Sequence, residues 1–457
     1  MKSSRSLSDR RQKKVCASCE EFASPNWLIS GIIFRDESPI YAQFLLLKGR
    51  YHSQMLSQLR EVRGYPGFTS LAISRFISNV GNGVSPIALA YGVLSLPNST
   101  GTDLSIVMAA RFVPLLAFML FGGVIADRFQ RNRLVGGSDM IGSFLAALSA
   151  ISLIVGFSST WLLALMGALF GILNAIWWPA MSGVLPEILP KEKLQEGNAV
   201  IGLTTNFGYI LGTLGGGILV STVGAGWGLL VDAISFFIAG AIVWNLPIVG
   251  KDKDKSPGII HDLAAGWKEF ISRSWVIAMV LSFALINMAF ESMLSVLGPL
   301  NFSDPVSGPR QWSYNLAGLS VGMLIGGIWV LKVKIGRPLF LAMILIALSA
   351  VWDFTLAFDS HIIFSVLASV ISGISLEVFM VTWNTSLQSH VPEESYSRVS
   401  SYDTLGSYGI APLGIVFAGP LAMHFGVNTI LFVTGGVTLV ASIASLMVPS
   451  VRNLRND

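Results

Sequence analysis

Residues 122–133 read GGVIADRFQRNR and place four charged side chains, Asp127, Arg128, Arg131 and Arg133, within seven residues. They follow directly on an apolar run that begins near Ile106. In the whole chain of 457 residues, 53% of the residues are hydrophobic and only 12% are charged. Soluble domains use about twice that proportion of charged residues, roughly 25%. The stretch is therefore a polar break in an unusually apolar chain.

The lengths of the apolar runs decide the fold class. From Gly67 to Pro449, long apolar runs alternate with short polar breaks, without the two-residue alternation of membrane β-strands. Each run can cross about 30 Å of hydrocarbon as a helix, which excludes a very apolar soluble domain. The predicted helices cover residues 68–96, 102–126, 134–156, 161–186, 198–222, 226–248, 275–299, 312–331, 338–357, 362–386, 402–424 and 427–448. The sequence therefore predicts an all-α membrane protein with twelve transmembrane helices.

The positions of lysine and arginine predict the orientation in the membrane. From Gly67 to the end there are 19 such residues, and all except Arg111 and Arg310 fall in alternate breaks or beside them. Short cytoplasmic loops are enriched in Lys and Arg, so both termini are expected to be cytoplasmic. Residues 122–133 then form the cytoplasmic loop between the second and third helices. We expect a multi-pass protein of the plasma or inner membrane, monomeric in the lipid bilayer and without nucleic acid partners.

The polar breaks also predict the domains. Residues 1–66 hold 11 of the 30 basic residues and only short apolar pieces, so we expect a poorly ordered extension in which Met55 is the working start. The lone CxxC pair there, Cys16 and Cys19, is interpreted as incidental. The predicted parts are an N-terminal six-helix bundle (67–249), a cytoplasmic amphipathic linker (250–274), a C-terminal six-helix bundle (275–449) and a cytoplasmic tail (450–457).

An internal repeat relates the two bundles. Pro190 is followed by glycines 22 and 27 residues later, and Pro392 is followed by glycines at the same spacings. Gly123, Arg128 and Arg133 correspond to Gly327, Lys332 and Arg337, each 204 residues later. A duplicated six-helix unit explains these marks and predicts two pseudo-symmetric bundles. In membranes such a repeat is typical of transporters whose substrate cavity lies between the halves.

Two motifs carry a family resemblance. GGVIADRFQRNR resembles the loop signature G-x-x-x-D-R-x-G-R-[RK] of the major facilitator superfamily, with Gln130 in the place of the second glycine. GYILGTLGGG (208–217) is similar to the antiporter signature G-x-x-x-G-P-x-x-G-G of that superfamily, with Thr213 in place of the proline. Stretches such as AARFVPLLAFMLFGG (109–123) and WNTSLQSHVPEESYSRV (383–399) are similar to an efflux branch that includes enterobactin exporters and macrolide efflux proteins. The resemblance implies a transporter.

The residues that match the two motifs are the first site candidates. In the loop they are Gly123, Asp127, Arg128 and Arg131, and in the fifth helix they are Gly208, Gly212, Gly216 and Gly217. Orientation alone does not explain Asp127, because acidic residues contribute little to it. We expect Asp127 to meet a helix N-terminus of the other half and to hold the inner side shut. Glycines at i, i+4 and i+8 indicate close helix packing. Plain packing and a sliding contact between the halves are compatible interpretations, of which plain packing is favoured.

Ionisable side chains deep in a span are costly and are therefore candidates for function. The candidates for proton coupling or for the cavity are Arg111, Asp232, Glu291 and Glu377. A carboxyl group in a low-dielectric cavity holds its proton more strongly than in water, so it can load and release protons as water access changes sides. Glu291 and Glu377 fit this task best, because both lie well inside spans. The alternative is that each acid has a fixed partner and never titrates.

Other side chains are weaker candidates. Asp353 also lies inside a span, whereas Asp139 and Asp403 lie nearer the cytoplasmic ends, where an interfacial position is possible. Most aromatic residues in spans face lipid, but Trp178 and Trp383 occupy corresponding helices of the repeat and are expected to line the cavity.

The predicted function follows from these parts. The sequence holds no GxxxxGK[ST], HExxH or GxSxG motif, so we expect no enzyme, cofactor or metal, and an ion gradient as the energy source. We expect proton-coupled efflux of a small hydrophobic or amphiphilic compound, such as a drug, a macrolide or a siderophore, by alternating access. The alternatives are an importer or facilitator of the same fold, or a polytopic receptor or scaffold that transports nothing.

Overall fold

The computed structural model describes residues 62–247, 267–333, 335–358 and 360–455. The expectations for the N-terminal extension up to residue 61, including Met55 and the CxxC pair, lie outside these ranges. So does most of the expected amphipathic linker, of which residues 267–271 are helical. From Val62 onward the chain forms one compact unit.

The first half consists of six long helices and two short ones, within the part of the chain described. They are α4 (Phe68–Leu94), α5 (Gly101–Arg128), α6 (Arg131–Val155), α7 (Thr160–Ser182), α8 (Val184–Ile188), the 3-10 turn η1 (Lys191–Lys193), α9 (Leu194–Val223) and α10 (Ala225–Trp244). A capping box begins α5, because the Asp103 carboxylate accepts the backbone N–H of Thr100 at 2.9 Å. The same carboxylate accepts the Thr160 hydroxyl at 2.8 Å, which ties the start of α5 to the start of α7.

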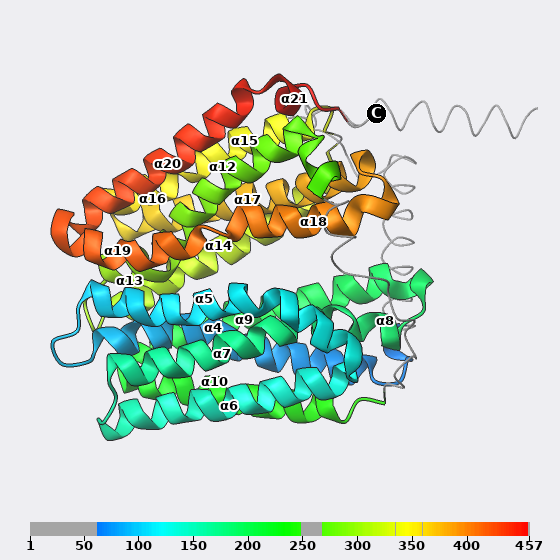
Figure 1. Ribbon diagram of the computed structural model, residues 1–457. Helices are drawn as coiled ribbons and strands as arrows, with labels where there is room; N and C mark the ends of the chain where they lie inside the picture. Colours follow the sequence, from blue (N-terminus) through cyan, green and yellow to red (C-terminus); the bar gives the residue numbers. More distant parts are fainter. Residues whose placement is uncertain (1–61, 248–266, 334, 359, 456–457) are drawn as a thin grey trace, which may run out of the picture. The chain divides into compact units, whose positions relative to one another are not determined.

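The second half has the same plan with more interruptions. Its elements are α12 (Ser274–Ser292), the π-helical turn η2 (Met293–Leu297), α13 (Gly298–Asn301), α14 (Gly308–Val330), α15 (Pro338–Ser349), α16 (Val351–Ala357), α17 (Ile362–His390), α18 (Glu393–Tyr408), α19 (Ala411–Phe425), α20 (Val427–Met447) and α21 (Pro449–Arg452). Figure 1 shows the long helices of each half packed side by side. This confirms the predicted all-α fold.

The packing partners repeat between the halves, as the duplication predicts. In the first half α5 packs on α7, α6 on α10, and α4 on both α9 and α10. In the second half α14 packs on α17, α15 and α16 on α20, and α12 on α18, α19 and α20. The fold is therefore two pseudo-symmetric bundles of transmembrane helices.

The apolar lengths agree with a membrane fold. Among the described residues, eleven helical segments are long and apolar enough to cross a membrane. The predicted first span, α4, falls outside that set because polar residues occupy much of its length. Its buried residues include Ser74, Arg75, Ser78, Asn79 and Ser85. This helix therefore turns a polar face into the first bundle.

The predicted second span ends too early, and the predicted third span begins too late. We expected spans over 102–126 and 134–156, but α5 continues through Asp127 and Arg128, and α6 already begins at Arg131. The loop consists only of Phe129 and Gln130. Arg128 in the last turn of α5 is favoured by the negative end of the helix dipole, which lets the helix continue past the apolar run.

Three predicted helices of the second half are interrupted. The predicted helix 275–299 holds the π-helical turn η2, just before Pro299, which cannot donate a backbone hydrogen bond to the preceding turn. The predicted helix 402–424 divides at 409–410, because Pro412 has no backbone N–H to donate to the Tyr408 carbonyl oxygen and its ring crowds that carbonyl. The predicted helix 338–357 divides at Ala350.

The loops fall at two ends of the bundle. We call the side of residues 95–100, 302–307 and 426 the sealed end, and the side of residues 129–130, 331–333 and 448–455 the basic end. Helices of the two halves meet along α5 with α19 and along α9 with α14. The site must therefore be sought along these inter-half contacts and among the buried polar groups behind them.

Candidate functional site

Hydrogen bonds between side-chain hydroxyls and backbone groups join the two halves at the sealed end. The Tyr91 hydroxyl on α4 donates to the carbonyl oxygen of Phe302 at 2.8 Å. The backbone N–H of Gly419 on α19 donates to Ser105 Oγ on α5 at 2.8 Å, and this contact is buried. A methyl group at Gly419 would overlap the carbonyl oxygen of Gly101. The helices approach this closely only because glycine has no side chain.

Apolar packing differs between the two ends. One cluster joins both halves toward the sealed end, and it includes Leu104 and Val107 of α5 with Met293, Val296 and Leu297 of η2. Toward the basic end the buried apolar residues form two clusters, one within residues 62–246 and the other within residues 270–451. The described residues therefore form a common core between the halves at one end, and a separate core in each half at the other.

Arg111 and Asp232 form a buried charge pair in the first half. Asp232 on α10 is 1% exposed and interacts electrostatically with Arg111 on α5. The Arg111 guanidinium also lies over the Phe170 ring, 4.5 Å from its centroid. A cavity of about 40 Å³ beside the pair is lined by both residues and by Ser85 and other residues of the bundle. This space is large enough for one water molecule.

A second buried charge pair was not predicted. Arg75 on α4 and Asp139 on α6 are 8% and 6% exposed and interact electrostatically. The Arg75 guanidinium lies over the Trp177 ring, 4.7 Å from its centroid. Neighbouring helices therefore bury Asp139 inside the first bundle. One sign of this pair was present in the sequence: an arginine, Arg75, is the eighth residue of the first predicted span, and the polar Asn79 follows one turn later on the same helix face.

Glu291 lies where two helices are irregular. It is the penultimate residue of α12, directly before η2, and it is partly exposed. Tyr408, the last residue of α18, interacts with it electrostatically. One turn earlier on α12, the Asn287 side-chain amide donates to the Ser407 carbonyl oxygen at 2.9 Å. Within the described residues, the Glu291 carboxylate forms no hydrogen bond or ion pair.

The other acids of the second half differ in their partners. Glu377 on α17 is partly exposed and packs against Gly326 and Gly327 of α14. The buried Asp353 accepts the Thr434 hydroxyl at 2.7 Å. Asp403 accepts the Trp383 indole N–H at 2.9 Å. Asp353 and Asp403 therefore have fixed partners, whereas Glu291 and Glu377 have none among the described side chains.

The predicted gating residues lie at the junction of α5 and α6. Asp127 is in the last turn of α5, and its side chain lies outside the described set. Gly123 borders open space, and Arg128 is exposed. Arg131 packs over Gly183 and lies 3.6 Å from the Glu187 carboxylate of α8. At this end Arg131 therefore binds within its own half.

The glycine face of α9 packs within the first half. Methyl groups at Gly208, Gly212 and Gly216 would meet the backbone of α4, at Phe76, Val80 and Val84 respectively. These three glycines therefore pack closely against a helix of their own half, not against the other half.

Gly217 is the glycine of α9 that faces the other half. A methyl group there would overlap Ser313 of α14. Because Gly217 lies about 100° around the helix from Gly216, it points to a different neighbour.

Trp178 and Trp383 do not occupy equivalent environments. Trp178 is 60% exposed, whereas Trp383 is 6% exposed. Trp383 packs edge-to-face with Trp275 at 5.5 Å and stacks with Phe379 at 6.1 Å. The expectation that Trp383 lines the cavity is therefore wrong, because its ring belongs to the packed core of the second half.

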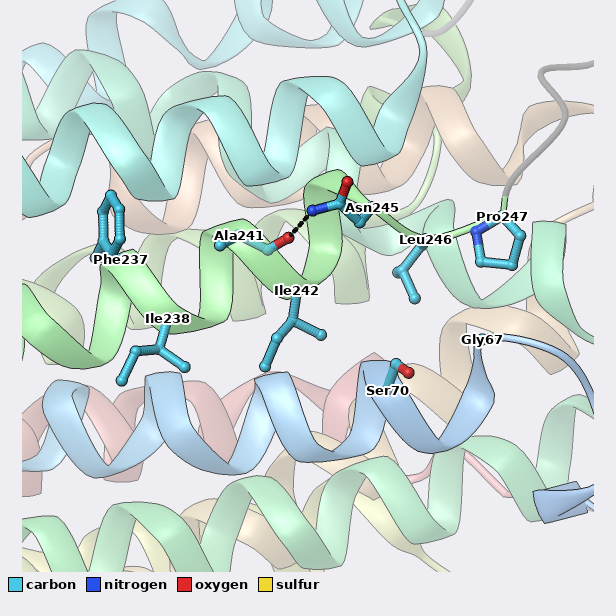
Figure 2. A pocket seen from close by; sticks show the side chains of 9 residues that line it. All are labelled: Gly67, Ser70, Phe237, Ile238, Ala241, Ile242, Asn245, Leu246 and Pro247. Carbon is cyan, nitrogen blue, oxygen red and sulfur yellow. Dashed lines mark hydrogen bonds between the residues drawn. The ribbon is translucent and has the colours of Figure 1, made fainter.

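A groove of about 660 Å³ lies apart from these charged groups. It runs between the start of α4 and the end of α10, and its nine lining residues are labelled in Figure 2. Its polar lining is limited to Ser70 and Asn245, and the Asn245 amide already donates to the Ala241 carbonyl oxygen at 2.8 Å. With no ionisable group in its wall, the groove offers no chemistry for coupling. Nor do the described residues contain a group of three His, Cys, Asp or Glu side chains that could hold a metal ion.

Comparison with protein families gives one match over most of the chain. The model described as Major Facilitator Superfamily matches residues 71–414. The multidrug efflux pump Tap of Mycolicibacterium fortuitum is 25% identical over 388 residues, which cover 82% of this chain and 94% of the pump. The enterobactin exporter EntS of Escherichia coli O1:K1 / APEC is 24% identical over 385 residues, which cover 80% of this chain and 88% of the exporter.

Solved structures share the fold. A peptide transporter POT in complex with sulfate has a TM-score of 0.67 at 16% identity and covers 87% of this chain and 99% of its own. A bacterial homologue of the human lysosomal transporter Spinster, inward-facing and unoccupied, has a TM-score of 0.64 at 14% identity, with 86% and 99% coverage. At these identities the likeness concerns the fold alone.

Proposed function

Because the chain belongs to the Major Facilitator Superfamily, we propose that it exports a small hydrophobic or amphiphilic compound by proton-coupled alternating access. It is a multi-pass membrane transporter of small molecules. Export is supported by the relatives, since one is named a multidrug efflux pump and another an enterobactin exporter. A drug, a macrolide or a siderophore is the proposed kind of substrate.

The difference between the two ends is the observation that carries this proposal. A common apolar core joins the halves at the sealed end, and separate cores occur at the basic end. A protein that alternates access needs contacts between its halves that can form at one end while the other end is open. The contacts of Tyr91 with Phe302 and of Ser105 with Gly419 would then break when the sealed end opens.

The basic end is proposed to face the cytoplasm of the plasma or inner membrane. It carries Arg128, Arg131, Arg133, Lys332 and Arg337, as the enrichment of basic residues in short cytoplasmic loops requires. The substrate would enter from the cytoplasm in the conformation described and leave when the sealed end opens. Both termini would be cytoplasmic.

Glu291 and Glu377 are proposed as the proton-coupling residues. Both are partly exposed carboxyl groups within predicted spans, and neither has a fixed partner among the described residues. Such a group can take up a proton from one side and release it to the other. Asp232 is a weaker candidate, because Arg111 already compensates its charge.

Asp127 is proposed as an asymmetric latch at the basic end. The repeat places Leu331 at the corresponding position of the second half, so only one half carries the acid. Asp127→Asn is expected to impair transport and to leave membrane insertion intact. Loss of insertion, or normal transport in this variant, would remove the latch from the account.

Loss of preloaded dye, macrolide or siderophore from expressing cells tests the function. Export should stop when an uncoupler is added and should slow in Glu291→Gln and in Glu377→Gln. Glu192→Gln, the same change on the exposed turn η1, should behave like the unmodified protein. Unchanged efflux in both test variants would refute the coupling residues. Equilibration in either direction without a gradient would indicate a facilitator, and no flux of any solute would favour a receptor or scaffold.

A further inference from the structure

Glu291 lies in an irregular part of the second bundle that also reaches the first bundle. The turn that follows it, η2, contacts α4 and α5. On the neighbouring helix, α18 ends at Tyr408 and α19 begins at Ala411, and α19 packs along α5. Two helices are thus interrupted beside the same carboxylate, next to the contact between the halves. Interrupted helices in transporters place helix ends and free backbone groups at the substrate site.

The charge around Glu291 is one-sided. The buried acids of the first half, Asp139 and Asp232, each interact with an arginine. In the second half, residues 274–309 and 399–451 contain no lysine or arginine. Helices α12 and α19, and the end of α18 beside Glu291, therefore supply no lysine or arginine, and the histidine of α19, His424, lies in its last turn. An uncompensated carboxylate inside a membrane protein is costly, so it either holds a proton or attracts a cation.

The local groups add negative potential. Tyr408 is the last residue of α18, so Glu291 lies beside the helix end that carries the negative end of the dipole. Tyr408 interacts electrostatically with Asp403 as well as with Glu291. The amide of Asn287 is already used by the Ser407 carbonyl oxygen and holds α12 against α18. A positively charged group is therefore the ligand that this position favours.

We propose that Glu291 receives the cationic group of the transported compound, so that the substrate class is an amphiphile with one positive charge. The proposal rests on the proposed transport function and adds the substrate class. The aromatic rings nearby suit the apolar body of such a molecule. The Phe290 ring, next to Glu291 in the sequence, and the Tyr408 ring are both only partly buried. A neutral molecule of the same shape would leave the carboxylate uncompensated.

Binding of a matched pair of fluorescent probes to the purified full-length protein tests this inference. Dansylcadaverine carries a primary ammonium group, and N-acetyl-dansylcadaverine has the same ring and chain without the charge. We expect the amine to bind at least tenfold more tightly than its acetylated form, which corresponds to about 1.4 kcal/mol. In Glu291→Gln the difference should vanish, whereas in Glu192→Gln it should persist.

The outcomes separate this inference from the function on which it rests. Equal affinities of the unmodified protein for the two probes, or no measurable binding of the amine at millimolar concentration, would overturn the inference without any variant. Selectivity that survives in Glu291→Gln would also overturn it. If Glu291→Gln does not fold, Glu291→Asp, which keeps the charge, should retain the preference for the amine. Uncoupler-sensitive export without amine selectivity would leave the proposed function standing and remove only the substrate class.

Discussion

Substitution of Gly419 by alanine should open the sealed end. The added methyl group would overlap the Gly101 carbonyl oxygen and would lie 2.6 Å from Ser105 Oγ, so α5 and α19 would have to move apart. Overpacking of this kind costs about 1–3 kcal/mol. The cost falls only on the conformation in which the halves touch here. The population open at the sealed end should therefore rise about 5- to 150-fold.

Cysteine labelling measures this shift. Ser313 is fully buried against Gly217 at the contact between the halves, so a membrane-impermeant maleimide should reach Ser313→Cys only after the sealed end opens. The background should lack Cys16 and Cys19, the two natural cysteines. The labelling rate should rise with the open population when opening and closing are fast relative to labelling.

A matched glycine gives the control for this prediction. A methyl group at Gly215 on α9 would meet no atom within 4 Å, so Gly215→Ala makes the same chemical change in open space. Its labelling rate should equal that of the parent protein. If Gly419→Ala labels no faster than Gly215→Ala, the contact between Gly101 and Gly419 does not limit opening, and the reasoning fails.

Three further predictions concern stability. Arg111→Met should lower the free energy of unfolding by about 3–5 kcal/mol, because it leaves the buried Asp232 carboxylate without its cation. Thermal unfolding of the purified protein measures this loss. Addition of Asp232→Leu should restore the stability in full. Gly212→Val should reduce the folded yield, because the side chain would overlap the Val80 carbonyl oxygen; a normal monodisperse yield would contradict the assigned packing. The Asp304 carboxylate accepts hydrogen bonds from backbone N–H groups in its loop, and these bonds lower its pKa. Their contribution to the stability of the folded protein is therefore complete above the ordinary Asp pKa near 4, and it is lost as the pH falls through the lowered pKa. Asp304→Ala should therefore melt earlier than the parent protein at neutral pH and equally at strongly acidic pH, and an equal difference at both would exclude the carboxylate as its cause.

The helices could be predicted because membrane thickness imposes their length on the sequence. The ends of the helices were harder to predict where the apolar run gives way to charged residues. Asp127 and Arg128 look like a loop when charge alone is considered, yet α5 includes both. A helix end at the membrane surface tolerates charge, so a change in polarity does not mark the last helical turn.

Contacts between helices were beyond the reach of a single sequence. The spacing of Gly208, Gly212 and Gly216 correctly indicated a close contact, but it could not show that the neighbour is α4 rather than the other half. In the same way, Arg75 and Asp139 are 64 residues apart in the sequence. They become neighbours only because α4 packs beside α10 and α10 packs beside α6. Periodicity identifies a face of a helix, whereas the fold identifies what that face meets.

The central claim is that the halves open at one end as they close at the other. Spin labels at Ser99 and Val306 would report the sealed end, and labels at Phe129 and Leu331 would report the basic end, in protein without its two natural cysteines. When Gly419→Ala is introduced, the distance between the first two positions should increase and that between the second two should decrease. Distances that stay fixed, or that change in the same direction at both ends, would contradict alternating access.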